Sequence, residues 1–127
     1  MKHPLMSATW MALAMALAAA QPTVAAEPGG DWAIEGMIGQ MHVSVICTLQ
    51  EADRKLTGSC HNEQYPDLPL TGEAGDGHVT WTYTVNYQGQ SLQVTYAGQL
   101  ESATSMKGDI LVGGNPSGSF TASRPQP

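Results

Sequence analysis

Residues 79–98 read VTWTYTVNYQGQSLQVTYAG, a pattern in which apolar and polar side chains alternate on either side of a short turn. Such alternation is typical of half-buried β-strands, and Gln88-Gly89 supplies a glycine for a tight turn between them. A two-residue turn at this point sets three pairs of inward-facing side chains opposite each other: Val85 with Leu92, Tyr83 with Val94 and Trp81 with Tyr96. The stretch therefore predicts an antiparallel hairpin with an aromatic inner face.

The same alternation, interrupted by turns rich in Gly, Asp, Asn and Pro, runs through the rest of the chain from residue 27 onward. Besides the two strands of the hairpin, it predicts strands at residues 32–38, 41–49, 56–60, 70–72, 106–112 and 118–124. We expect loops at 62–69 and 113–117. These eight segments, joined in order by short connections, close into an antiparallel up-and-down barrel without exposed sheet edges. The expected fold class is all-β, with a single eight-stranded barrel.

The N-terminal residues have the layout of a secretory signal peptide. Lys2 and His3 form a short polar start, and residues 5–20 are mostly Ala, Leu and Met without charge. Small residues then lead to an expected cleavage site after Ala26, with Ala20 as an alternative. We therefore expect a signal helix at 1–26 and one β-barrel domain at 27–127. The apolar run is too short to remain as a membrane anchor, so the mature protein is expected in the periplasm or secreted.

The charge of the mature part excludes some classes of partner. It carries all 11 acidic residues of the chain and all but one of its five Lys and Arg residues. Nucleic acids and anionic membrane surfaces both require a basic footprint, so neither is the expected partner. The acidic residues are scattered along the sequence, and their simplest role is to keep the domain soluble.

Both cysteines, Cys47 and Cys60, lie in the expected mature domain. If Asp53 and Arg54 form the tip of a hairpin, the two cysteines lie directly opposite each other, at the separation that a disulfide requires. An even cysteine count in an exported chain also favours a disulfide. The alternative is a redox-active pair, which would lack the usual Cys-x-x-Cys spacing and a flanking cation.

No residue pattern predicts catalysis, a metal site or a cofactor. The mature histidines are His42, His61 and His78, and none has the spacing of a helical zinc site. His61 lies near Glu63 and His78 near Asp76, where a solvated surface and a metal ligand are the competing interpretations. The chain has neither the Gly-x-Ser-x-Gly motif nor a phosphate-binding loop. Paired carboxylates at the barrel mouth stay open as an alternative.

Five aromatic side chains are expected to point into the barrel: Trp32 and the four that form the candidate ligand site, Trp81, Tyr83, Tyr96 and Phe120. One interpretation is that they fill the core. The other is that they line a pocket in which a small apolar ligand binds.

Gly30-Asp31-Trp32, at the first expected strand, resembles the Gly-x-Trp element of the calycins, the group of lipocalins, fatty-acid-binding proteins and avidin-like barrels. Four further motifs follow it along the chain: Leu56-Thr57-Gly58, Gln88-Gly89, Met106-Lys107-Gly108 and the final Gly118-Ser119-Phe120-Thr121-Ala122-Ser123-Arg124. Their order resembles an uncharacterised group of small exported bacterial barrels. The resemblance implies that Trp32 and Arg124 close one end of the barrel by stacking. The chain is shorter than a lipocalin and lacks its helix, and avidin-like ligand residues cannot be placed on it.

These observations together predict an exported, non-enzymatic β-barrel that binds a small apolar ligand or a secreted protein partner. A second comparison, with small periplasmic metalloprotease inhibitors, gives an alternative function. In that alternative the protein inhibits a periplasmic protease or a lysozyme through its N-terminal segment, residues 27–31, or through its loops. The sequence makes no prediction of the oligomeric state.

Overall fold

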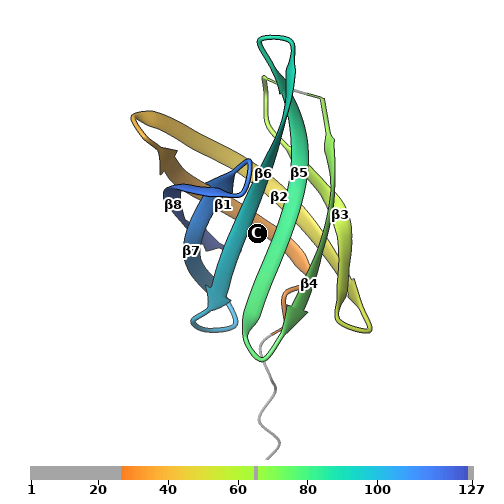
Figure 1. Ribbon diagram of the computed structural model, residues 1–127. Coiled ribbons are helices and arrows are strands. Elements are labelled where there is room, and N and C mark those ends of the chain that lie inside the picture. Colours follow the sequence, from red (N-terminus) through yellow and green to blue (C-terminus); the bar gives the residue numbers. More distant parts are fainter. Residues whose placement is uncertain (1–26, 65, 126–127) are drawn as a thin grey trace, which may run out of the picture.

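The computed structural model describes residues 27–64 and 66–125, which form one closed antiparallel barrel (Figure 1). Its strands follow one another in sequence order, and the last pairs with the first. They are β1 (Gly30–Ile38), β2 (Met41–Ala52), β3 (Lys55–His61), β4 (Leu68–Gly75), β5 (His78–Tyr87), β6 (Gln90–Leu100), β7 (Ser105–Val112) and β8 (Asn115–Ser123). The predicted all-β, eight-stranded barrel is confirmed. The predicted signal peptide lies outside the described residues.

The register of the β5–β6 hairpin is the one expected from the sequence. Trp81 pairs with Tyr96, Tyr83 with Val94 and Val85 with Leu92. Gln88 and Gly89 form the two-residue turn with φ angles of 52° and 81°, which match the right-handed twist of the flanking strands. The described residues contain no helix long and apolar enough to cross a membrane.

Two of the predicted loops are shorter in the structure. The expected loop at 113–117 is a two-residue turn, because Gly113 and Gly114 both adopt positive φ and let β8 begin at Asn115. The register between β7 and β8 shifts between Ile110 and Leu111 to accommodate this turn. The expected loop at 62–69 likewise ends early, since β4 begins at Leu68 and not at residue 70. Pairing with β3 extends this strand in both directions.

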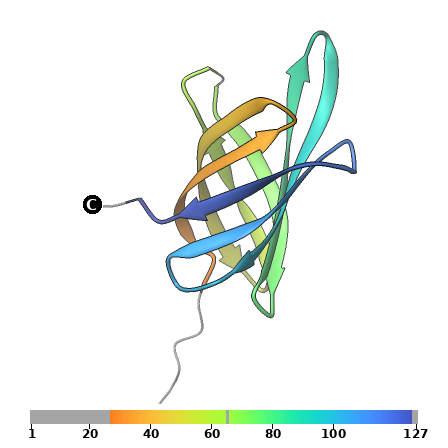
Figure 2. The ribbon, with the colours of Figure 1, turned by 90° about the vertical axis from the view of Figure 1, so that its left-hand side faces the viewer.

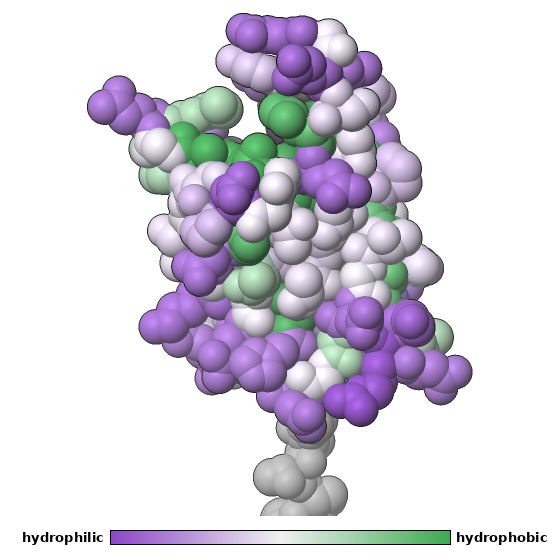
Figure 3. Space-filling model, viewed as in Figure 1, coloured by the Kyte–Doolittle hydropathy of each residue, from purple (hydrophilic) through white to green (hydrophobic). Residues whose placement is uncertain are grey.

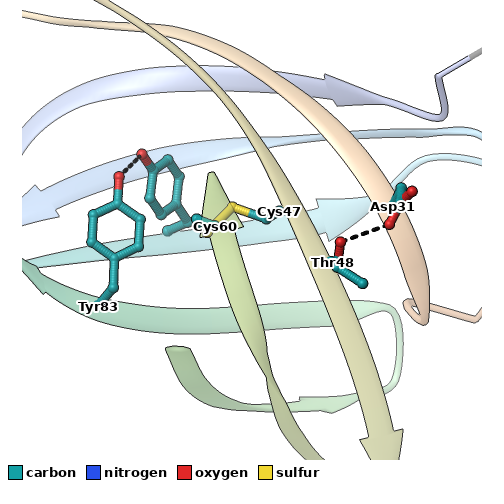
Figure 4. The surroundings of a disulfide bond; sticks show 6 residues. Asp31, Cys47, Thr48, Cys60 and Tyr83 are labelled. Carbon is teal, nitrogen blue, oxygen red and sulfur yellow. Dashed lines mark hydrogen bonds between the residues drawn. A yellow bond between two sulfur atoms is a disulfide. The ribbon is translucent and has the colours of Figure 1, made fainter. Parts of the chain in front are cut away.

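The disulfide predicted from the sequence is present between β2 and β3. Cys47 and Cys60 are directly opposed, with their Cα atoms 3.9 Å apart. Both are fully buried in the barrel. In Figure 4 the disulfide lies between Tyr83 on one side and the hydrogen-bonded pair of Asp31 and Thr48 on the other. The covalent link therefore joins two neighbouring strands from inside the core.

One end of the barrel is closed by Arg124, which follows β8. Its guanidinium carbon lies 4.0 Å from the centre of the Trp32 ring, so the stacking contact implied by the calycin resemblance is present. The same guanidinium donates hydrogen bonds to three carbonyl oxygens, those of Glu27, Gly29 and Ala103, at 2.7, 2.5 and 3.2 Å. The indole nitrogen of Trp32 donates to the carbonyl oxygen of Pro28 at 2.8 Å. These contacts fix the chain before β1 and the β6–β7 turn to one end of the barrel.

We expect Arg124→Ala to lower the free energy of unfolding by about 1–3 kcal/mol, because three carbonyl groups lose a charged donor and the indole loses its cation. Urea unfolding measures this change. Lys107→Ala is the control, since Lys107 forms only an exposed ion pair with Glu101 at 3.1 Å, and such pairs contribute about 0–1 kcal/mol. Equal losses in the two variants would contradict the closing role of Arg124.

Several inward positions carry glycine because neighbouring strands approach too closely for a side chain. A Cβ atom at any of five positions would collide with a carbonyl oxygen of the next strand: Gly36, Gly58, Gly72, Gly108 and Gly118. At Gly72, for example, the added atom would meet the Thr80 carbonyl oxygen and would lie 2.7 Å from the Cα of Trp81. These close approaches allow the sheet to bend sharply enough to close.

The substitution Gly72→Ala should therefore cost about 1–3 kcal/mol of unfolding free energy, the usual range for forcing a methyl group into a packed site. Gly29→Ala provides a matched control, since its Cβ would meet only the Leu49 carbonyl oxygen at 3.7 Å, an ordinary contact. Chemical denaturation of both variants tests the difference. The steric account fails if Gly72→Ala is as stable as Gly29→Ala.

Candidate functional site

The two ends of the barrel differ in their side chains. The β2–β3, β4–β5 and β6–β7 turns lie at the closed end, beside the start of β1, at the bottom of Figure 1. Within the described part of the chain, all Lys and Arg residues lie at or next to this end: Arg54, Lys55, Lys107 and Arg124. Figure 3 shows hydrophilic residues gathered there, whereas hydrophobic residues surround a hollow near the opposite end. We call that opposite end the mouth.

The mouth is lined by apolar side chains that continue the inward face of six of the strands, all but β3 and β8, beyond the core. These residues are Ile38, Met41, Val43, Leu68, Val85, Tyr87, Leu92 and Val112, all of them half-buried or exposed. Met41 and Tyr87 are the most open, with exposed fractions of 56% and 48%. Exposure of grouped apolar side chains costs solvation free energy, and such groups commonly mark a binding surface.

The floor beneath the mouth is an aromatic cluster. Trp81 stacks on Tyr96 with ring centres 5.2 Å apart, and Phe120 meets both rings edge-on at 5.9 and 5.2 Å. Tyr83 lies 5.6 Å from Tyr96 by ring centres. The four residues predicted as a ligand site are thus brought together, but each is at most 7% exposed. They pack against one another and form a floor, while the accessible apolar surface lies above them.

Polar atoms of this floor are few and mostly paired. The hydroxyl groups of Tyr83 and Tyr96 share a hydrogen bond of 2.7 Å. The indole nitrogen of Trp81 is buried without a hydrogen-bond partner. Burial raises the pKa of the Tyr96 hydroxyl well above its usual range, and the neighbouring Tyr83 adds to this effect. Burial among the rings of the floor therefore strongly disfavours an ionised group.

This raised pKa predicts that stability falls at high pH. A tyrosine in the unfolded chain ionises near pH 10, whereas folded Tyr96 stays neutral, so unfolding releases a proton and is favoured as the pH rises above about 10. Tyr96→Phe lacks this contribution, and its unfolding free energy should fall less steeply between about pH 9 and about pH 11. Urea unfolding at both pH values measures the slope. Identical slopes would show that Tyr96 ionises alike in both states.

Among the hollows on the surface of the described residues, one lies at the mouth and a broader one on the outer face, and neither lies inside the floor. A hollow of about 240 Å³ lies at the mouth, between the start of β4 and the upper part of β5. Its lining is made by Pro66, Leu68, Thr84, Val85, Asn86 and Ser91. A broader depression of about 500 Å³ lies on the outer face of β5–β8, where polar side chains such as Thr80, Gln99 and Asp109 surround it. The first hollow shares Leu68 and Val85 with the mouth.

Two of the three histidines in the described residues, His42 and His61, form exposed pairs with acidic residues, and His61 does so with Asp67 and not with the nearer Glu63. His42 contacts Glu35 at 2.8 Å across β1 and β2, and His61 contacts Asp67 at 2.7 Å. Ser44 also donates to Glu35, at 2.9 Å. Over residues 27–64 and 66–125, no group of three or more acidic, His or Cys side chains is arranged to hold a metal ion.

Comparison with protein-family models and with curated proteins finds no match to this chain. The likeness to calycins therefore consists of the closed eight-stranded antiparallel barrel itself and of the contact between Trp32 and Arg124. The mouth residues were not singled out from the sequence. The sequence pattern that could have indicated them is the inward apolar alternation, which continues to the strand ends, for example through Val85 to Tyr87.

Proposed function

We propose that this chain is an exported binding module that takes up a small apolar ligand at the mouth of its barrel. The observation that carries the proposal is the ring of inward-facing apolar side chains left half-buried or exposed above a packed floor. A ligand that covers Met41, Val85, Tyr87 and Leu92 would remove their apolar surface from water, a gain of about 25 cal/mol for each Å². The aromatic floor limits how deep the ligand can enter.

Two further observations agree with this proposal. The Cys47–Cys60 disulfide is of the kind that persists in oxidising compartments outside the cytosol, which supports export. The side chains named above as lining the mouth are hydrocarbons except for the Tyr87 phenol and the Met41 thioether, and they include no carboxylate, histidine, serine or cysteine. We therefore propose binding without catalysis.

The alternative of an inhibitor acting through its N-terminal segment receives less support. Pro28 is buried, and the carbonyl groups of Glu27 and Gly29 are held by Arg124. Entry of this segment into the active-site cleft of a protease would require the loss of these contacts. The loops at the mouth lie at the opposite end of the barrel from this anchored segment, so a protein partner at that end would leave these contacts in place and agrees better with the structure.

Leu92→Glu tests the proposal, because it places a charge on the apolar wall of the mouth. Gln93→Glu is the matched control: it makes the same charge change on the next residue, which is exposed on the outer face of β6. The neutral dye N-phenyl-1-naphthylamine reports binding by its fluorescence. We expect Leu92→Glu to weaken dye binding at least about tenfold, since a charge is costly to desolvate, and Gln93→Glu to leave it unchanged.

Thermal unfolding of both variants confirms that the barrel is intact before the titrations are compared. Absence of dye binding to the unmodified protein, or equal binding to the two variants, would rule out the mouth as an apolar ligand site.

A further inference from the structure

Among the described residues, no strand pairs with the upper part of the β5–β6 hairpin on either side. Pairing of β5 with β4 ends at Thr82 and Thr71, and pairing of β6 with β7 ends at Val94 and Val112. The two strands of the hairpin continue to pair with each other as far as Tyr87 and Gln90. Figures 1 and 2 show this hairpin projecting beyond the neighbouring strands. A barrel that is otherwise closed therefore keeps a short exposed sheet edge.

The alternating hydrogen bonds between β5 and β6 identify which backbone N–H and C=O groups of β5 point away from β6. In a two-residue hairpin the residues that close the turn, here Tyr87 and Gln90, exchange hydrogen bonds with each other. The odd-numbered residues of β5 therefore bond to β6, and the even-numbered residues point the opposite way. Beyond Thr82, the N–H and C=O groups of Thr84 and Asn86 point out of the hairpin on the side of β4.

Pro69 explains why β4 does not cover this edge. Continuing the register of Thr71 with Thr82 would place Pro69 opposite Thr84. Proline has no N–H group, so it cannot donate the ladder hydrogen bond that the Thr84 carbonyl would accept. The ladder stops at this point, and β4 and β5 separate toward the mouth.

The gap between the two strands is the hollow of about 240 Å³ described above. Its lining combines the edge residues Thr84 and Asn86 with two apolar side chains, Leu68 and Val85. Natural proteins commonly protect an exposed edge with a lysine or a proline. Residues 84–86 read Thr-Val-Asn and contain neither.

The charge around the gap has one sign. Glu63 and Asp67 lie in the segment between β3 and β4, whose residue Pro66 lines the gap, and both are exposed; the Asp67 carboxylate also contacts His61 at 2.7 Å. The Lys and Arg residues of the described chain lie at the other end of the barrel. A basic occupant is therefore attracted to the gap and an acidic one is repelled.

We propose that this gap is a strand-addition site, which binds an extended basic segment of a partner protein. The segment pairs with β5 through the backbone groups of Thr84 and Asn86. One of its apolar side chains lies against Leu68 and Val85, and its Lys or Arg side chains lie near Glu63 and Asp67. Main-chain hydrogen bonds give such a complex its affinity, and the side-chain contacts give it specificity.

An acetylated, amidated heptapeptide of alternating Lys and Val residues is the probe. Hydrogen exchange followed by NMR is expected to show the amides of Thr84 and Asn86 slowed at least about tenfold by the peptide, as for newly hydrogen-bonded strands. Thr84→Pro removes the edge N–H without touching the bonds to β6, and it should weaken peptide binding at least about tenfold. Gln93→Pro is the matched control, because Gln93 lies directly opposite Thr84, its N–H points out of the other edge of the same hairpin, and it does not line the gap; this variant should bind as the unmodified protein does.

Two further peptides separate the backbone and charge contributions. Methylation of alternate backbone nitrogens, or replacement of Lys by Glu, should each abolish binding or weaken it at least about tenfold. Peptide binding that is insensitive to Thr84→Pro, or no binding at millimolar peptide, overturns the proposal. A dimer in analytical ultracentrifugation that Thr84→Pro dissociates would assign the edge to a second copy of the chain and would likewise overturn it. Dye binding at the mouth is measured separately, so either proposal can fail while the other stands.

Discussion

The pairing of β1 with β8 is the constraint on which the rest of the structure depends. It runs from Ala33 with Ser123 to Ile38 with Gly118 and converts an open sheet into a barrel. Closure requires the strands to bend, and the bend is possible because Gly36 and Gly118, which lie on these two strands, leave room for the neighbouring carbonyl groups. Arg124 then follows directly from β8 and seals the end by contacting Trp32. The absence of side chains at a few inward positions thus decides the shape of the whole domain.

The same narrow interior divides the barrel into a floor and a mouth. Large rings fill the middle, where Trp81, Tyr96 and Phe120 contact one another, and an eight-stranded barrel has little further space at that level. Inward side chains above them, such as Ile38, Val43 and Val85, pack against this core on one side and remain partly exposed on the other. An apolar mouth is therefore a consequence of where the aromatic residues lie along each strand.

Much of the fold could be predicted from the sequence because its decisive signals are local. The turn at Gln88-Gly89 and the alternation around it gave the hairpin register, and the position of Asp53-Arg54 between Cys47 and Cys60 gave the disulfide. The candidate site was harder to predict, because alternation assigns Trp81 and Val85 to the same inward face without giving their depth in the barrel. Depth depends on the tilt and stagger of all the strands. Likewise, the effect of Pro69 becomes visible only when its partner strand is known.

The projecting hairpin connects the two surfaces at the mouth end. Val85 lines both the mouth and the gap beside β4. A strand added to β5 would fix the backbone on which Val85 and its partner Leu92 are carried, and a ligand in the mouth would restrain the same side chains from within. Two ligands that order the same element affect each other's affinity by equal factors. An isolated two-stranded ribbon is marginally stable by itself. The projecting end of the β5–β6 hairpin is such a ribbon, so it is the part of this barrel best suited to such coupling.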